Sequence, residues 1–424
     1  MKRLLVYSHD TFGLGNIRRM LCICEYLLAA IPDLSILLVS GSPMVHSFRL
    51  PRYLDYIKLP CLRRTEEGDY AVRAMGTTLN ETIQLRSDLL RTIVANFRPQ
   101  ILLVDKKPYG VENELYDTLR YLQTSLAEAK LILLLRDILD SAGPTIRAWE
   151  KHGYHEAIES FYDLILVVGS PEIFDPCETY QFPASVAAKV RFCGYIRRQP
   201  GRKSRDVLRH DLQLQGEKLI LVTPGGGEDG YQLLATYVEG LAWLPAGHNT
   251  QSLIVCGPEM PAAQRTMLYK AAATYPHVRL SDFTDDMLSY VSTADVVVAM
   301  AGYNTVCEVL SLHKRAIVVP RVKPVAEQWI RAERMACRGL LQTIHPDALT
   351  PQRLMHTVMA TLNSPNGHHS PLPQLDLNAL PRIAQYISTL LDDEEKITAS
   401  VDNRAHAKRL RPLSTLHLRG ALHP

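Results

Sequence analysis

A glycine-rich turn after an apolar run is one of two segments of this sequence suited to hold a phosphate group. The run Thr223-Pro224-Gly225-Gly226-Gly227-Glu228-Asp229-Gly230 joins a predicted strand to a predicted helix. Successive glycine N–H groups at the start of a helix can bind a diphosphate. The run lacks the Gly-Lys-Ser/Thr sequence of a Walker loop, and its two acids could simply cap the helix. We therefore predict phosphate contacts at Gly225, Gly226 and Gly227, with a purely structural turn as the alternative.

A second turn of small residues follows the apolar run at 296–300. It reads Ala301-Gly302-Tyr303-Asn304-Thr305. Asn304 or Thr305 can cap the next helix, so that the N–H groups from Gly302 to Thr305 face the same ligand. Phosphate binding without a metal would follow from this arrangement.

Two further positions could bind the hydroxyls of a sugar. Glu308 lies about one turn inside the helix that follows and could accept both hydroxyls of a ribose, although a lone helical glutamate is more often solvated or a cap. Glu327 and Gln328 begin another helix after the loop at 319–326. Their side chains suit hydrogen bonds to sugar hydroxyls, or they form a capping pair.

The first loop of the chain, Ser8-His9-Asp10-Thr11-Phe12-Gly13-Leu14-Gly15-Asn16, also lies between a predicted strand and a predicted helix. Gly13 and Gly15 allow a tight turn and a close approach of a ligand to the backbone. A dinucleotide-binding fingerprint would need a third glycine where Arg18 stands and an acid after the second strand. An NAD site is therefore disfavoured, and a structural turn remains an alternative.

These loops are expected to be positioned by two α/β domains in series. Short β-branched or leucine-rich runs alternate with longer amphipathic segments, which predicts parallel strands joined by helices. We expect strands at 3–8, 35–40, 56–59, 100–105, 131–136, 164–168, 190–194, 219–223, 252–256, 278–280, 296–300 and 316–319, and second-domain helices at 231–244, 262–274, 286–293, 305–312 and 327–338. Open α/β sheets bind ligands beyond the carboxyl ends of their strands, where the four motifs stand.

A polar run with proline and glycine near Arg197 marks the junction between the domains. We predict an N-terminal acceptor-side Rossmann-like domain at 1–196, a linker at 197–204, a C-terminal donor domain at 205–362, a linker and helix at 363–395 with the helix at 379–391, and a basic, disordered tail at 396–424.

Composition and charge exclude several classes of function. The chain has 424 residues, of which 46% are hydrophobic and 21% charged, as in folded soluble proteins. The net charge is +3, but residues 396–424 alone contribute +5, so the folded body is nearly neutral. A nucleic-acid binder needs a basic face on the fold itself, so this class is disfavoured.

No segment predicts an anchor, a disulfide framework or a metal site. The longest apolar runs are far shorter than the roughly 20 residues that span a bilayer, and the N-terminus lacks the apolar stretch of a signal peptide. The eight cysteines include no Cys-x-x-Cys pair, and no Asp-x-Asp triplet occurs. We expect a cytoplasmic protein that uses no metal and no cofactor, with contact at the inner face of a membrane at most peripheral.

Together these motifs resemble the glycosyltransferases of the GT-B fold, especially the MurG-like group with the family 28 C-terminal domain, over about residues 1–360. The family pattern is matched by Phe283, Ala294-Asp295, Gly302, Glu308 and Gln328. The resemblance implies that Glu308 holds the ribose of the nucleotide and Gln328 the donor sugar. It also implies that the glycine loop approaches the donor diphosphate and that the loop with Gly13, Gly15 and Asn16 faces the acceptor.

One departure concerns the catalytic base. Relatives commonly end the first loop in Gly-His, whereas this chain has Gly15-Asn16, and an amide cannot accept the proton of a hydroxyl. His9 is the natural substitute, because a neutral imidazole can abstract a proton near pH 7. Asp105, at the end of the fourth strand, could orient its ring, and Asp10 competes for the role of base.

The resemblance thus implies an inverting, metal-independent glycosyltransferase that moves a sugar from a nucleotide-diphosphate sugar, with UDP favoured, to the hydroxyl of an unidentified acceptor, lipid-linked or small. A non-catalytic nucleotide-sugar binding protein and a nucleotide-sugar 2-epimerase-like enzyme remain alternatives.

Overall fold

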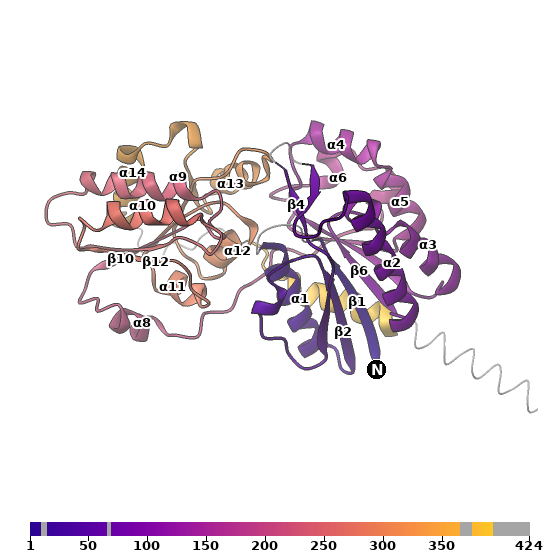
Figure 1. Ribbon diagram of the computed structural model, residues 1–424. Coiled ribbons are helices and arrows are strands. Elements are labelled where there is room, and N and C mark those ends of the chain that lie inside the picture. The colour runs from indigo at the N-terminus through magenta and orange to yellow at the C-terminus, as the bar shows by residue number, and fades with distance from the viewer. Residues whose placement is uncertain (10–14, 66–68, 365–374, 393–424) are drawn as a thin grey trace, which may run out of the picture.

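The computed structural model describes residues 1–9, 15–65, 69–364 and 375–392. The chain forms two lobes, each built on a parallel sheet with helices on both faces (Figure 1). The predicted fold class, two Rossmann-like halves of the GT-B type, is confirmed. Asp10, Gly13 and the tail at 396–424 lie outside the described residues.

The first lobe contains a seven-stranded sheet in the order β3-β2-β1-β6-β7-β8-β9. All neighbouring strands in it are parallel. Its strands are β1 (Lys2–Ser8), β2 (Leu34–Ser40), β3 (Leu54–Lys58), β6 (Ile101–Asp105), β7 (Lys130–Arg136), β8 (Leu164–Val168) and β9 (Val190–Phe192). Its helices are α1 (Gly15–Ala30), α2 (Leu79–Phe97), α3 (Tyr116–Ser125), α4 (Ala142–Lys151), α5 (Tyr154–Phe161), α6 (Pro176–Thr179) and α7 (Ala184–Ala187), with 3-10 turns at η1 (Val45–Ser47) and η2 (Val111–Asn113).

The second lobe contains a six-stranded parallel sheet in the order β12-β11-β10-β13-β14-β15. Its strands are β10 (Lys218–Thr223), β11 (Thr250–Val255), β12 (Val278–Ser281), β13 (Val296–Ala299), β14 (Ala316–Val318) and β15 (Gln342–Thr343). Its helices are α8 (Arg205–Asp211), α9 (Tyr231–Gly240), α10 (Ala262–Ala272), α11 (Met287–Thr293), α12 (Tyr303–Ser311), α13 (Glu327–Cys337) and α14 (Pro351–Asn363), with 3-10 turns at η3 (Leu241–Trp243) and η4 (Pro346–Ala348).

The central strands are apolar because helices cover both faces of each sheet. Every residue of β6 and of β13 is buried. Parallel strands covered on both sides therefore appear in the sequence as continuous apolar runs rather than as alternating ones. This is why the sequence locates them to within one or two residues.

Several elements of the structure, α8 among them, were not predicted. The antiparallel hairpin of β4 (Leu62–Arg64) and β5 (Tyr70–Val72) stands apart from the main sheet. Strand β15 has only two residues, and α14 follows it. Strands this short carry almost no periodicity, so pattern reasoning has little to detect.

The last described helix, at 379–392, returns to the first lobe. Its apolar residues Ile383, Ile387 and Leu391 are fully buried in the core that also contains β1 and β6. The backbone N–H of Tyr195 donates to the carbonyl of Asp376 at 2.7 Å, and Lys2 pairs with Asp392. The helix predicted at 379–391 is confirmed, and it packs on the N-terminal lobe.

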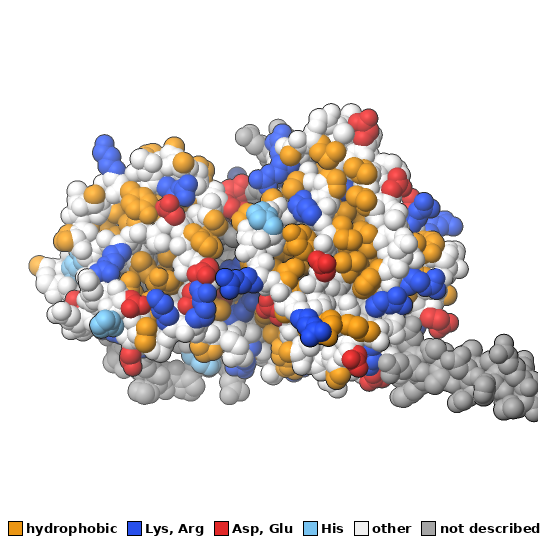
Figure 2. All heavy atoms as spheres, turned by 60° about the horizontal axis from the view of Figure 1, so that its bottom comes forward, with side chains coloured by type: hydrophobic (Ala, Val, Ile, Leu, Met, Phe, Trp, Pro, Cys, Tyr) orange, Lys and Arg blue, Asp and Glu red, His pale blue; other side chains and the backbone are white. Residues whose placement is uncertain are grey.

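Each sheet has one place where the strand order reverses. In the first lobe this place lies between β1 and β6, and in the second between β10 and β13. Neighbouring crossover helices leave a crevice at such a reversal, which is where open α/β sheets bind ligands. Figure 2 shows charged side chains of both signs gathered where the two lobes meet.

Candidate functional site at the two sheet reversals

The second lobe brings its two predicted phosphate loops together. Strands β10 and β13 are direct neighbours, with Thr223 opposite Ala299, so the loops that follow them start side by side. A Cβ placed on Gly225 would lie 3.6 Å from Oγ1 of Thr305. The structure therefore places Gly225 and Thr305, from separate motifs, at one location.

The glycine loop requires its glycines for backbone geometry. Gly225 and Gly227 have φ of 90° and 102°, which disfavour other residues. A Cβ on Gly227 would lie 2.4 Å from the carbonyl oxygen of Cys256, and a Cβ on Gly226 would lie 2.7 Å from a carboxylate oxygen of Glu259. The N–H of Gly225 donates to Oγ1 of Thr223 at 3.2 Å.

Acidic side chains surround this loop. Burial raises the pKa of Glu228 and of Glu259, and each is raised further by neighbouring acids, while Arg73 opposes the shift. Asp229 forms an ion pair with Arg321 at 3.0 Å. These acids would repel a diphosphate bound at the glycine loop. Binding a diphosphate there therefore requires the positively charged groups next to α12 to offset the repulsion.

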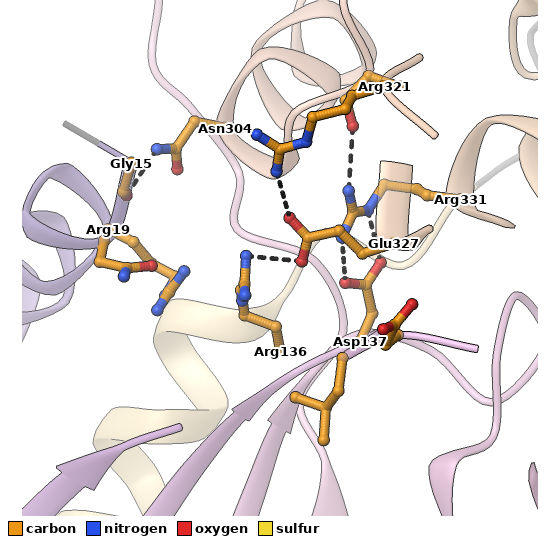
Figure 3. Close-up of polar contacts among 12 residues, drawn as sticks. Gly15, Arg19, Arg136, Asp137, Asn304, Arg321, Glu327 and Arg331 are labelled. Atoms are coloured by element: carbon orange, nitrogen blue, oxygen red, sulfur yellow. Dashed lines mark hydrogen bonds and ion pairs between the residues drawn. The ribbon is translucent and has the colours of Figure 1, made fainter. Parts of the chain in front are cut away.

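Helix α12 begins earlier than the sequence predicts. Gly302 occupies the N-cap position, with φ −62° and ψ 144°, and no side chain caps the helix. The expected cap by Asn304 or Thr305 is therefore wrong, because both residues already lie within the first turn. Instead, Nδ2 of Asn304 donates to the carbonyl of Gly15, in the other lobe, at 2.9 Å (Figure 3).

Glu308 is buried and faces the first lobe. Its carboxylate accepts a hydrogen bond from the guanidinium of Arg18 in α1 at 2.7 Å. Arg198 reaches the same end of α12 and donates to Oδ1 of Asn304 at 2.9 Å. Two arginines from outside the second sheet thus contact α12, Arg198 in its first turn and Arg18 further along the helix.

Glu327 and Gln328 are buried at the start of α13. Figure 3 shows Glu327 between two arginines, Arg136 at 2.9 Å and Arg321 at 3.8 Å. Burial by itself would raise the pKa of Glu327, but the positive charge of Arg136 and of its other basic neighbours lowers it to about 2. Oε1 of Gln328 accepts the backbone N–H of Arg321 at 3.1 Å, so this amide shapes the loop before its own helix.

His9 is buried at the reversal of the first sheet. Its Nε2 lies 3.2 Å from the hydroxyl of Tyr70, and its buried Nδ1 has no hydrogen-bond partner among the described residues. Burial, and then the charges of Lys106 and Lys107, hold the pKa of His9 well below its usual value. His9 is therefore a neutral imidazole at pH 7.

Contrary to the expectation, Asp105 forms no hydrogen bond with His9. Its carboxylate accepts a hydrogen bond from the guanidinium of Arg19 at 2.7 Å, and both side chains are buried. The hydrogen-bond partner of His9 is Tyr70 from the β4–β5 hairpin, which the sequence did not reveal. Asn16 donates to the carbonyl of His9 at 2.8 Å, so its amide positions the backbone there, and Gly15 begins α1.

A buried ion pair between the lobes was missed altogether. Nε and Nη2 of Arg331 donate to the two oxygens of Asp137 at 2.9 and 2.8 Å, and both side chains are fully buried. Arg331 also donates to the carbonyl of Ala301 at 3.0 Å, and Tyr195 donates to Asp137 at 3.0 Å. Charged residues directly after the apolar run at 131–136 were the available signal, because a charge at that position lies at the ligand-binding edge of the sheet.

Two searches for other features found none in the described part of the chain. No group of three or more His, Cys, Asp or Glu side chains there could hold a metal ion. None of the helices at 1–9, 15–65, 69–364 and 375–392 is both long enough and apolar enough to cross a membrane.

Residues 219–385 match the model of the glycosyltransferase family 28 C-terminal domain. This range covers nearly all of the second sheet, the loops after β10 and β13, and part of the returning helix. The second lobe of this chain is therefore similar to the family 28 glycosyltransferase C-terminal domain.

Individual relatives show the same similarity. A UDP-N-acetylglucosamine–N-acetylmuramyl-(pentapeptide) pyrophosphoryl-undecaprenol N-acetylglucosamine transferase of Acidiphilium cryptum is 31% identical over 187 residues, which are 43% of this chain and 50% of the relative. The first curated relatives are matched over 38% to 54% of their own length, so the chain spans about half of them or less.

Solved structures share the fold over nearly the whole chain. MurG of Acinetobacter baumannii has a TM-score of 0.55 at 16% identity and covers 92% of this chain and 100% of its own. A putative UDP-N-acetylglucosamine 2-epimerase of Listeria monocytogenes has a TM-score of 0.62 at 12% identity and covers 93% and 98%. Both likenesses concern the fold.

Proposed function

We propose that this protein is an inverting, metal-independent glycosyltransferase that moves a sugar from a UDP-linked donor to the hydroxyl of an acceptor. The observation that carries the proposal is the meeting of the two sheet reversals. Glu308 and Asn304 in α12 contact Arg18 and Gly15 in the first turn of α1. Donor and acceptor held at the two reversals would therefore adjoin.

The donor diphosphate is proposed to bind at the start of α12. The free N–H groups of the first helical turn favour an anion there. Arg18 and Arg198 add positive charge next to this turn, and in our proposal they compensate the charge that develops on the leaving diphosphate. Glu308 would accept hydrogen bonds from the hydroxyls of the ribose. Arg18 would then have to release part of the Glu308 carboxylate.

The glycine loop, Tyr303, Thr305, Glu327 and Gln328 complete the proposed donor site. Gly225 lies close enough to Thr305 to share a ligand with it. Glu327 is already paired with Arg136, so its role is to hold the arginines in place. Gln328 is then the residue that would hydrogen-bond to the sugar hydroxyls.

His9 is the proposed base, with Asp10 as the competing candidate. The acceptor oxygen attacks the anomeric carbon on the face opposite the diphosphate, its proton passes to the imidazole, and the nucleoside diphosphate leaves with the bonding electrons. A neutral histidine can accept that proton at pH 7, and Tyr70 fixes the orientation of its ring. Asp105 is left with a structural role beside Arg19.

The acceptor and the cellular location belong to the same proposal. Several curated relatives are named for an undecaprenol-linked acceptor, which supports a lipid-linked acceptor here, and a small molecule is the other class. A cytoplasmic enzyme with peripheral membrane contact would have access to both classes of acceptor.

The deciding experiment measures binding first and turnover second. Calorimetric titration with UDP, ADP and GDP should show a preference for UDP, and incubation of UDP-sugars with lipid-linked and soluble acceptors should release UDP with a new glycosidic bond. Activity that survives chelation supports the metal-free mechanism, and strict dependence on added divalent metal contradicts it.

Donor incubated without any acceptor separates the alternatives. An epimer of the donor sugar would assign the chain to the 2-epimerase class instead. Tight UDP-sugar binding without turnover over the whole acceptor panel, unchanged in Asn16→His, would assign it to the non-catalytic binding proteins.

A further inference from the structure

Three adjacent strand ends place basic side chains around His9. The strands β1, β6 and β7 are neighbours in the first sheet. His9 follows β1, Lys106 and Lys107 follow β6, and Arg136 ends β7. These residues therefore lie at the carboxyl edge of the sheet, beside its reversal, and the proposed reaction uses only the histidine.

The β4–β5 hairpin closes over this edge. The ring of Tyr70 carries the guanidinium of Arg64 at 4.9 Å and the ammonium of Lys107 at 5.1 Å. Its hydroxyl accepts a hydrogen bond from Arg64 at 3.1 Å and lies 3.2 Å from Nε2 of His9. The ring holds two cations next to the proposed base.

The backbone of Lys106 fixes this residue at the same edge of the sheet. Its N–H donates to the carbonyl of Leu134 in β7 at 2.9 Å, and its φ is 73°, which an L-residue adopts only when its surroundings impose it. Lys106 as a whole residue is partly exposed.

The negative charge near this cluster is already engaged. Glu327 forms an ion pair with Arg136 at 2.9 Å and lies 3.8 Å from Arg321. Burial, and then the charge of Arg136, lowers the pKa of Lys106 to about 7; Arg64 and Lys107 act in the same direction, and Glu327 opposes them. Among the described residues, Lys106, Lys107 and Arg136 are three basic groups at this edge of the sheet, and Glu327 is paired with one of them, Arg136.

We propose that Lys106, Lys107 and Arg136 form a subsite for an oxyanion, a carboxylate or a phosphate, that is part of a substrate and lies beside the reacting centre. This inference rests on the proposed function and adds a substrate class to it. The cations would fix the orientation of the anionic substrate next to His9, because ammonium and guanidinium groups form strong charge-assisted hydrogen bonds with such anions.

The anion has two conceivable sources. A donor sugar that carries a carboxylate, as in UDP-glucuronate, would enter from the side of Gln328. An acceptor that carries a carboxylate or phosphate next to its hydroxyl would enter from the side of the hairpin. The shared chemistry is the oxyanion, and the experiment below distinguishes the sources.

The first arm tests the subsite with sulfate, which does not titrate between pH 6 and 9. Sulfate binding by the full chain is measured calorimetrically for the wild type, Lys106→Gln, Lys106→Arg and Lys107→Gln. We expect at least a fivefold loss of affinity in both glutamine variants and near wild-type affinity in Lys106→Arg. Wild-type affinity should also fall as pH rises through 7, because Lys106 loses its proton there.

The control is Lys270→Gln, which removes a lysine from α10 in the second lobe. Sulfate affinity that falls equally in Lys270→Gln and Lys106→Gln, or that does not change in either, overturns the proposal. UDP affinity, measured on the same samples, should stay within twofold of the wild type. A wild-type chain that binds sulfate but no UDP would reject the proposed function and leave the subsite standing.

The second arm identifies the source. Affinities for UDP-glucuronate and UDP-glucose are compared in the wild type and in Lys106→Gln. A preference of tenfold or more for the uronate that disappears in the variant assigns the subsite to the donor. Equal donor affinities, with KM raised in the variant only for phosphate- or carboxylate-bearing acceptors, assign it to the acceptor, and no effect on either substrate overturns its role in substrate binding.

Discussion

At the scale of single residues, the candidate site depends on pairs that join distant parts of the chain. The sequence identified Glu308 and His9 by type and by position after a strand. It could not show that Arg18 binds Glu308 or that Tyr70 binds His9, because these partners are 290 and 61 positions away and come from other elements. Candidate residues could be predicted, whereas their partners required the fold.

Glu308→Gln should distinguish binding of ribose from binding of phosphate. The substitution removes a charged acceptor, worth about 1.5–3 kcal/mol, so we expect UDP affinity to fall roughly 10- to 100-fold while inorganic pyrophosphate loses much less. Calorimetric titration of both ligands measures the difference. An equal loss for UDP and pyrophosphate would show that Glu308 does not bind the ribose.

The second prediction at this scale concerns His9 and pH. His9→Ala should lower kcat by about 10²- to 10⁴-fold and leave the KM for the donor nearly intact, because a general base acts on the acceptor proton. Unchanged turnover would eliminate His9 and favour Asp10.

The pH profile gives an independent check on His9. Its pKa in the folded protein lies well below the unfolded value near 6.5, so its neutral form persists as the pH falls and the acidic limb of kcat should lie below pH 6.5. By the same linkage, the contribution of this group to stability is present in full above pH 6.5 and is lost as pH falls through the folded pKa. Urea unfolding between pH 7 and 5 should show a smaller decline in His9→Ala than in the wild type.

At the scale of elements, the site is built from loops at the reversals of the two sheets. Apolar runs covered on both faces made the strands easy to predict, so the loops that follow them were located correctly. The start of α12 was placed two residues late, because polar side chains suggested a cap where the structure uses Gly302. The β4–β5 hairpin was missed because three-residue strands show no clear alternation.

Gly227→Ala tests whether the glycine loop is fixed by packing. The new Cβ would clash with the carbonyl of Cys256 at a φ of 102°, so we expect a loss of roughly 1–3 kcal/mol in the free energy of unfolding and weaker UDP binding. Gly216→Ala is the matched control, since it has a φ of 130° and open space around its Cβ. Equal effects of both substitutions in urea unfolding would mean that only backbone strain matters.

At the scale of the whole molecule, buried charge holds the two lobes together. Arg331 and Asp137 are fully buried and come from different lobes, and Asp140 also accepts the N–H of Ala326 at 2.9 Å. The sequence indicated two domains and a junction but not these contacts, because ion pairs between distant segments leave no periodic signal.

Asp137→Asn should destabilise the arrangement of the lobes. It leaves the buried guanidinium of Arg331 without its counter-charge, at a cost of about 3–5 kcal/mol. The double variant Asp137→Leu with Arg331→Leu removes both charges and should lose less. Urea unfolding gives the energies, and a larger radius of gyration in X-ray scattering of Asp137→Asn would report separation of the lobes. A double variant that is less stable than the single one would contradict this account.

The helix at 379–392 packs into the first lobe, so that this lobe is built from two segments that are far apart in the chain. In genetic terms, the second lobe is an insertion within the first lobe, bounded by the junction at 197–204 and by the residues before Leu375. A chimera that imports the corresponding lobe of a relative as a cassette between those borders would keep both pieces of the host lobe. A gene truncated after residue 196 would leave the docking surface for Ile383 and Ile387 bare, and its product should aggregate.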